Sequence, residues 1–103
     1  GTDASVNVTF SNANENGIAN YAVLVSQNAA LSEAAATNLY LGGKTKFVAK
    51  TDKNATVTAD DTGAALSAGT YYVYVLSVAD GTSAIANKLS APSAVTINLQ
   101  SSN

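Results

Sequence analysis

Few residue types in this 103-residue chain can do covalent chemistry. The chain contains no histidine and no cysteine, so it lacks the usual general base, the imidazole metal ligand and the thiolate nucleophile. None of its serines lies in a G-x-S-x-G elbow, the turn that activates a nucleophilic hydroxyl in many hydrolases. We therefore expect a protein that is not an enzyme and that uses no cofactor.

Two adjacent carboxylates form the most plausible cation site in the sequence. Asp60 and Asp61 are followed by Thr62 and Gly63 in an expected loop. Calcium takes several oxygen ligands from flexible loops, so Asp60 and Asp61 are candidate calcium ligands. We favour a simple turn, in which an aspartate accepts hydrogen bonds from its own backbone, because the ligand series of an EF-hand is absent. No metal is assigned on this basis.

Four of the five basic residues lie close together in the sequence, at Lys44, Lys46, Lys50 and Lys53. They form either a cationic patch for an anionic wall polymer or an edge strand whose lysines deter pairing with another chain. We favour the edge strand. The formal net charge is only −2 and arginine is absent, so nucleic acid and anionic membranes are not expected partners.

Five tyrosines are the remaining candidates for a binding surface, and there is no tryptophan. We expect Tyr21, Tyr72 and Tyr74 on buried strand faces, and Tyr40 and Tyr71 nearer the surface. An exposed, coplanar aromatic pair would suit a sugar ring, but two tyrosines serve packing more often than sugar binding.

These residues lie on elements that the sequence indicates are mainly short strands around one long strand, Leu66 to Val78. In that stretch Tyr72, Tyr74, Leu76 and Val78 share one face, and the other face is also largely apolar. Both faces should therefore be covered. Shorter alternating strands are expected near 4–10, 18–26, 44–50, 55–59 and 94–99, separated by polar turns.

One segment breaks the β pattern. Residues 28–38 are rich in alanine and favour a short helix near 29–37, capped by Asn28 or Ser32, with an extended piece resuming at 39–41. We interpret the helix as an insertion between strands rather than as a separate layer. The sequence thus predicts an all-β, two-sheet sandwich of about seven strands, with residues 1–103 as one domain.

The order of motifs resembles a fibronectin type III or related immunoglobulin-like domain. Leu66, Thr70 and Tyr72 match the Leu, Thr and Tyr that precede the family's long strand, which implies that Tyr72 is the corner tyrosine. Leu89 to Ser93 resembles the break before the last strand, and Asn20 to Val23 resembles the third strand. The chain departs from the family in three ways: Phe10 stands where a tryptophan is usual, the helix is extra, and the segment before Val6 is too short for a first strand.

The amino-acid sequences of residues 21–32 and 69–81 are also similar to those of modules in Gram-positive surface-layer proteins and other cell-wall-anchored proteins. This resemblance implies an extracellular location at a bacterial cell surface and a structural role as a spacer. The expected partners are neighbouring domains of a longer polypeptide and identical subunits. The alternative is a carbohydrate-binding or adhesin module. For the core that holds the sandwich together, the sequence predicts Phe10, Tyr21, Val23, Leu66, Tyr72, Leu76, Val95 and Ile97.

Overall fold

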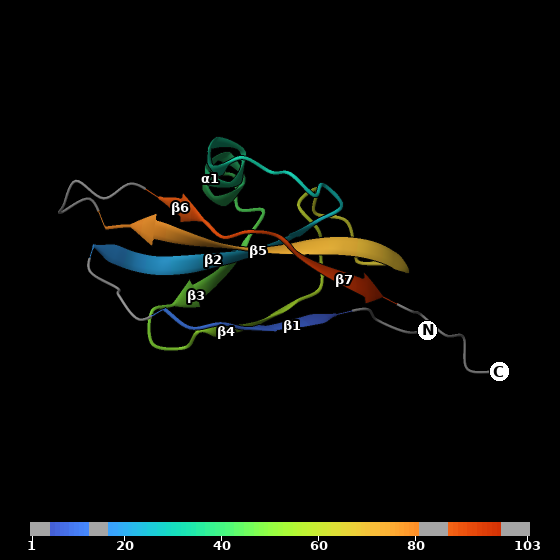
Figure 1. The fold of residues 1–103 in the computed structure, drawn as a ribbon, viewed down its shortest axis with the longest axis horizontal. Helices are drawn as coiled ribbons and strands as arrows, with labels where there is room; N and C mark the ends of the chain where they lie inside the picture. Colours follow the sequence, from blue (N-terminus) through green and yellow to red (C-terminus); the bar gives the residue numbers. More distant parts are fainter. Residues whose placement is uncertain (1–4, 13–16, 81–86, 98–103) are drawn as a thin grey trace.

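The computed structural model describes residues 5–12, 17–80 and 87–97. Two β-sheets pack face to face, and one helix covers the outer face of the larger sheet (Figure 1). No helix in these residues is both long and apolar enough to span a membrane. The elements are β1 (Val6–Thr9), β2 (Ile18–Ser26), α1 (Glu33–Leu41), β3 (Lys46–Ala49), β4 (Asn54–Val57), β5 (Gly69–Ala79), β6 (Lys88–Leu89) and β7 (Ser93–Ile97).

The chain passes back and forth between the two sheets. The small sheet pairs β1 with β4, and the large sheet has the order β3-β2-β5, with β6 and β7 both on the far edge of β5. All described pairings are antiparallel. The longest strands, β2 and β5, are thus the centre of the large sheet, with Ala22 opposite Leu76 and Val25 opposite Val73. In Figure 1, β1 begins and β7 ends at the same end of the sandwich.

The inner core lies between the two sheets. Side chains alternate along a strand, so Tyr21, Val23 and Val25 of β2 all point toward the small sheet. The alternation expected for residues 18–26 is therefore confirmed. Other members of this core come from both sheets and from the segment before β5: Val6, Ile18, Val48, Ala55, Val57, Leu66, Tyr71 and Ile97.

A second core lies between the large sheet and α1. Ala22 and Leu24 of β2 face the helix, and Tyr74, Leu76 and Val78 of β5 pack beside them around the buried Ala36. The helix does lie between two strands, as expected, but the expectation that it forms no separate layer is wrong. The outer face of β2 and β5 is apolar, so it has to be covered, and α1 forms the layer that covers it.

The boundaries of α1 follow its caps rather than its composition. Ser32 is the N-cap, because its Oγ accepts the backbone N–H of Ala35 at 3.1 Å, whereas Asn28 accepts the N–H of Ala30 in the preceding turn. The helix then continues through 39–41, where the sequence suggested an extended piece, because Leu39 and Tyr40 pack against the large sheet. It is a nine-residue helix displaced from the expected 29–37.

The core residues expected from the sequence divide among three environments. Tyr21, Val23, Leu66 and Ile97 are buried in the inner core, and Leu76 is buried in the helix-side core. Phe10 and Val95 are half-buried at the rim of the inner core, and Tyr72 is half-buried on the helix side. Ala4 and Leu99, expected at the ends of the first and last strands, lie outside the described residues.

Candidate functional site

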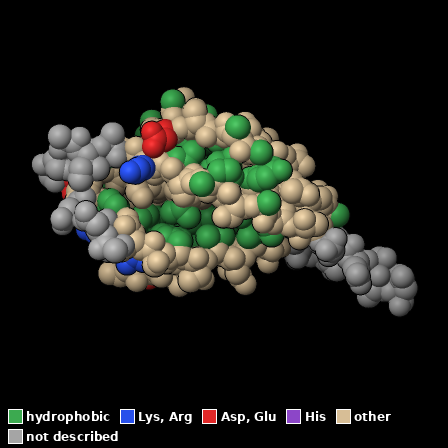
Figure 2. All heavy atoms as spheres, in the orientation of Figure 1, with side chains coloured by type: hydrophobic (Ala, Val, Ile, Leu, Met, Phe, Trp, Pro, Cys, Tyr) green, Lys and Arg blue, Asp and Glu red, His purple; other side chains and the backbone are tan. Residues whose placement is uncertain are grey.

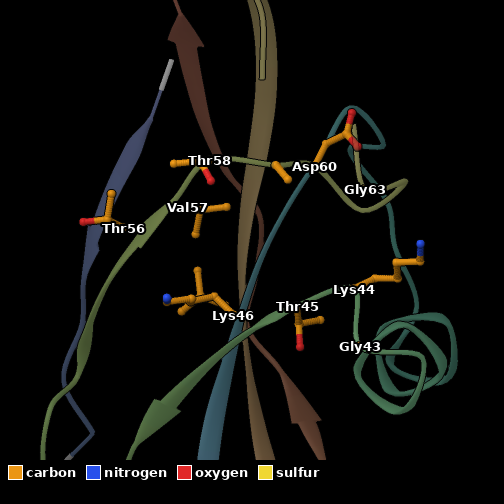
Figure 3. Close-up of a pocket in the computed structure, with 11 residues that line it drawn as sticks. Gly43, Lys44, Thr45, Lys46, Thr56, Val57, Thr58, Asp60 and Gly63 are labelled. Carbon is orange, nitrogen blue, oxygen red and sulfur yellow. The ribbon is translucent and has the colours of Figure 1, made fainter. Parts of the chain in front are cut away.

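The hollow nearest to the predicted site residues opens between β3 and β4 (Figure 3). It measures about 270 Å³, and Val23 and Val57 contribute its apolar lining. It exists because β3 is the edge strand of the large sheet and pairs only with β2 among the described strands, so the sandwich stays open along this side. The rest of its lining, polar apart from Ala59 and the glycines, comes from two chain segments: Gly43, Lys44, Thr45 and Lys46 on one side, and Thr56, Thr58, Ala59, Asp60 and Gly63 on the other.

The two lysines beside this hollow do not converge. In Figure 3 the amino groups of Lys44 and Lys46 extend in opposite directions. The Lys44 Nζ lies next to Gly63, only 3.3 Å from where a Cβ on that glycine would stand. A pair of ammonium groups that hold one anion must approach the same point, and this pair does not.

The hydroxyl groups around the hollow are also partly engaged elsewhere. Thr56 Oγ1 donates a hydrogen bond to Asn7 Oδ1 at 2.7 Å, which turns it toward β1 and away from the hollow. No hydroxyl in this lining lies beside a general base, since the chain has no histidine and the lining carboxylate, Asp60, is held by its own loop. The hollow can accept a small polar group, but its geometry provides no nucleophile with a base.

Asp60 organises the loop that follows β4. Its Oδ1 accepts the backbone N–H of Thr62 at 2.8 Å, the Thr62 hydroxyl, and the backbone N–H of Ala64 at 3.2 Å. Desolvation by itself would raise the pKa of Asp60. The hydrogen bonds from Thr62, Ala64 and Gly63 together outweigh that effect and hold the pKa below its ordinary value.

Asp61, the other calcium candidate, is directed to a different partner. Its Oδ2 accepts a hydrogen bond from Ser26 Oγ at 2.7 Å, and its backbone N–H donates to the Val25 carbonyl. The two neighbouring carboxylates therefore tie the loop to itself and to the end of β2. Across the described ranges, no three His, Cys, Asp or Glu side chains gather as a metal site requires.

The lysine cluster lies where the edge-strand interpretation places it. β3 is the edge of the large sheet and carries Lys46, with Lys44 and Lys50 just outside its two ends. Phe47 on the same strand is 62% exposed, so this edge combines a large hydrophobic side chain with charges that discourage strand pairing.

The tyrosine assignments need a correction. Tyr71, which the sequence places near the surface, is only 2% exposed, and its hydroxyl accepts the backbone N–H of Ser67 at 3.2 Å. The hydrogen bond to the chain just upstream of β5, which the sequence led us to expect from Tyr72, is therefore made by Tyr71. Both faces of β5 are apolar, so the sequence did not show which face meets the small sheet. In the structure it is the face that carries Tyr71. None of the five tyrosines is fully exposed.

No protein-family model, curated protein or solved structure matches this chain. The case for a function therefore rests on the architecture and on the chemistry of its surfaces.

Proposed function

We propose that this chain is a non-catalytic, immunoglobulin-like structural module of a bacterial cell-surface protein, which spaces neighbouring domains and makes protein–protein contacts. The observation that carries the proposal is the strand order. In immunoglobulin-like sandwiches strands B and E lie in one sheet, and C, F and G, often with C′, lie in the other. The described strand order supports this comparison when β1 and β4 are set against B and E, β3, β2 and β5 against C′, C and F, and β6 with β7, which both pair with β5, against G.

The corner at the start of β5 gives independent support. A tyrosine near the start of strand F, whose hydroxyl bonds to the backbone a few residues upstream, is a hallmark of this class of sandwich. Tyr71 is the third residue of β5, and it bonds the backbone of Ser67 four positions earlier. The same contact would stiffen the link between the two sheets, as a spacer requires.

The chemistry of the described surfaces supports a role without catalysis. Asp60 and Asp61 bind their own loop and β2, and the lysines beside the hollow diverge. The low charge and the abundance of Ser, Thr, Asn and Ala fit an exported surface module, which is the basis for placing it at a cell wall. The carbohydrate-binding alternative loses Tyr71 as a surface residue.

The proposal is tested by ligand screening of the purified chain against a glycan array and anionic wall polymers. We expect no saturable binding. Binding that is lost in Lys44→Ala, beside the hollow, but kept in Lys50→Ala, outside it, would replace the spacer role with recognition. In the full-length protein, exchanging residues 5–97 for a flexible Gly/Ser linker should broaden the distance distribution between the flanking domains, as measured by single-molecule energy transfer.

A further inference from the structure

We propose that a second copy of this chain docks on the open side of the sandwich by adding its β1 antiparallel to β1. The inference builds on the proposed structural role, because it names the surface through which one module contacts an identical one. Its basis is a groove of about 390 Å³ between β1 and β7, on the opposite side of the sandwich from the β3–β4 hollow.

The groove runs along two strand edges. Consecutive residues of β1, Val6 through Thr9, line it together with Phe10, and so do Ser93, Ala94 and Val95 of β7. Successive side chains of a strand point to opposite faces, so a hollow that touches every residue in a row faces the backbone edge. Within the described ranges β1 pairs only with β4, and β7 pairs only with β5, which leaves both facing edges without a strand partner.

The inner core is incomplete at this groove. Five hydrophobic residues are left half-buried around the inner core, namely Val8, Phe10, Val73, Val75 and Val95, and all five line the groove. A neighbouring hollow shares Phe10, Val75 and Ser90 with it, so the opening continues toward β6. Figure 2 shows the same feature as a band of hydrophobic side chains across the middle of this face, with the charged side chains in view toward one end.

These surroundings define the chemistry of the occupant. An unpaired edge presents N–H and C=O groups at strand spacing, which an extended segment satisfies by β-augmentation. The apolar residues of the floor recur every second position along β1 and β5, so the occupant needs apolar side chains at alternate positions. The lining contains no charged residue, so the occupant must be neutral.

β1 itself meets all three requirements. Its sequence alternates Val6 and Val8 with Asn7 and Thr9, and it has no charge and no proline. The edge strand on the other side of the sandwich, β3, is protected by lysines, whereas β1 carries no such protection. Two identical strands that pair antiparallel are related by a two-fold axis, so the assembly closes as a dimer and does not grow into a fibre. The same symmetry brings each copy's apolar groove next to the other's.

The test is sedimentation equilibrium of the purified chain, from about 10 μM to 1 mM, a range that detects dissociation constants typical of weak contacts. We expect a monomer–dimer equilibrium. Asn7→Lys combined with Thr9→Lys should weaken dimerisation at least tenfold. When the outward faces of the two β1 strands lie on the same side of the joined sheet, the new lysines of one copy stand opposite or diagonal to those of the other and repel them. The matched control is Thr56→Lys with Thr58→Lys, which adds the same charge on β4 and just beyond its end and also removes the Asn7–Thr56 hydrogen bond, but lies away from the groove.

Three results would overturn the inference. The first is a chain that stays monomeric throughout, and the second is a dimer that the β1 lysines weaken no more than the control lysines. The third is a chain that does not self-associate yet binds a synthetic peptide of residues 5–12, with amide shifts along β1 and β7, which would assign the groove to a free extended segment and not to a folded second copy. None of these results touches the spacer role, which fails instead if the ligand screen finds binding that is lost in Lys44→Ala and kept in Lys50→Ala.

Discussion

The hydroxyl of Tyr71 accepts the backbone N–H of Ser67 at 3.2 Å, while the ring of Tyr71 is buried against the small sheet. This one side chain thus links the segment that leads from the small sheet into β5 to the start of β5, and it also fills part of the inner core. Its neighbour Tyr72 faces the helix side, and its hydroxyl makes no hydrogen bond with the described residues.

Tyr71→Phe should therefore lower the free energy of unfolding by about 0.5–1.5 kcal/mol, the net value of one hydrogen bond, because the ring is kept and only the hydroxyl is lost. Tyr72→Phe is the matched control and should change stability by less than about 0.5 kcal/mol. Urea unfolding followed by tyrosine fluorescence measures both. If Tyr72→Phe costs more than Tyr71→Phe, the corner has been assigned to the wrong residue.

Leu76→Ala should cost about 2–5 kcal/mol, because Leu76 is completely buried between the large sheet and α1 and its removal leaves a cavity. Leu41→Ala offers the same chemical change at a position that is 75% exposed, and should stay within about 0.5 kcal/mol of the parent. Thermal melting by circular dichroism compares the two. A Leu76→Ala protein that melts like the parent would show that the helix-side core is not packed as described.

Tyr74→Phe should loosen the segment that leads into α1. The Tyr74 hydroxyl donates to the Asn28 carbonyl at 2.6 Å and accepts the Leu31 N–H at 3.2 Å, so its loss frees both groups. Hydrogen exchange at Leu31 should become faster, while exchange in β2 stays close to that of the parent. Tyr40→Phe, on the helix itself, should leave Leu31 unchanged. Faster exchange across the whole of β5 would indicate global destabilisation instead of a local anchor.

The stability contributed by Asp60 should depend on pH in a defined direction. Its pKa is lowered in the folded state, so the folded protein binds fewer protons at Asp60 than the unfolded chain does in mildly acidic solution. The contribution is complete above the unfolded pKa of about 3.9 and is lost as the pH falls through the folded pKa. The parent should therefore exceed Asp60→Asn in melting temperature at pH 7, and the difference should shrink below about pH 4.

Asp52→Asn provides the control for this titration, because the Asp52 side chain makes no hydrogen bond with the described residues. Its melting temperature at pH 7 should stay close to the parent's. A difference between the parent and Asp60→Asn that grows toward low pH would contradict the assigned sign.

Periodicity was sufficient to predict the strands but not the roles of their faces. β2 could be predicted from Ile18 to Ser26 because this run of strand-forming residues follows a turn signal, although both of its faces prove to be buried. In β5 both sets of side chains are apolar, so alternation could not tell which face meets the small sheet. For that reason the sequence placed Tyr72 where the structure has Tyr71. The role of the helix as a layer was missed for a related reason. An alanine-rich segment shows that a helix is favoured, but it does not show which surface the helix covers.

The candidate site shows a different limit. That Asp60 and Asp61 lie in a loop could be inferred from composition, but adjacent residues in a turn send their side chains in different directions, which only the fold determines. The lysines near β3 were more predictable, because edge protection depends on which residues a strand contains. The groove beside β1 could not be predicted, because its lining comes from strands of both sheets that only the fold brings together.

Because β1 begins and β7 ends at the same pole of the sandwich, the direction of an applied load decides how the module responds. Tension between those two points would open the antiparallel ladders like a zipper, breaking one hydrogen-bonded rung at a time from Val6–Val57 and from Gly69–Ile97. Rungs that break in sequence resist far less than rungs sheared together. We expect a module built in this way to unfold at a lower force when it is pulled from the start of β1 and the end of β7 than when its strands are pulled past one another.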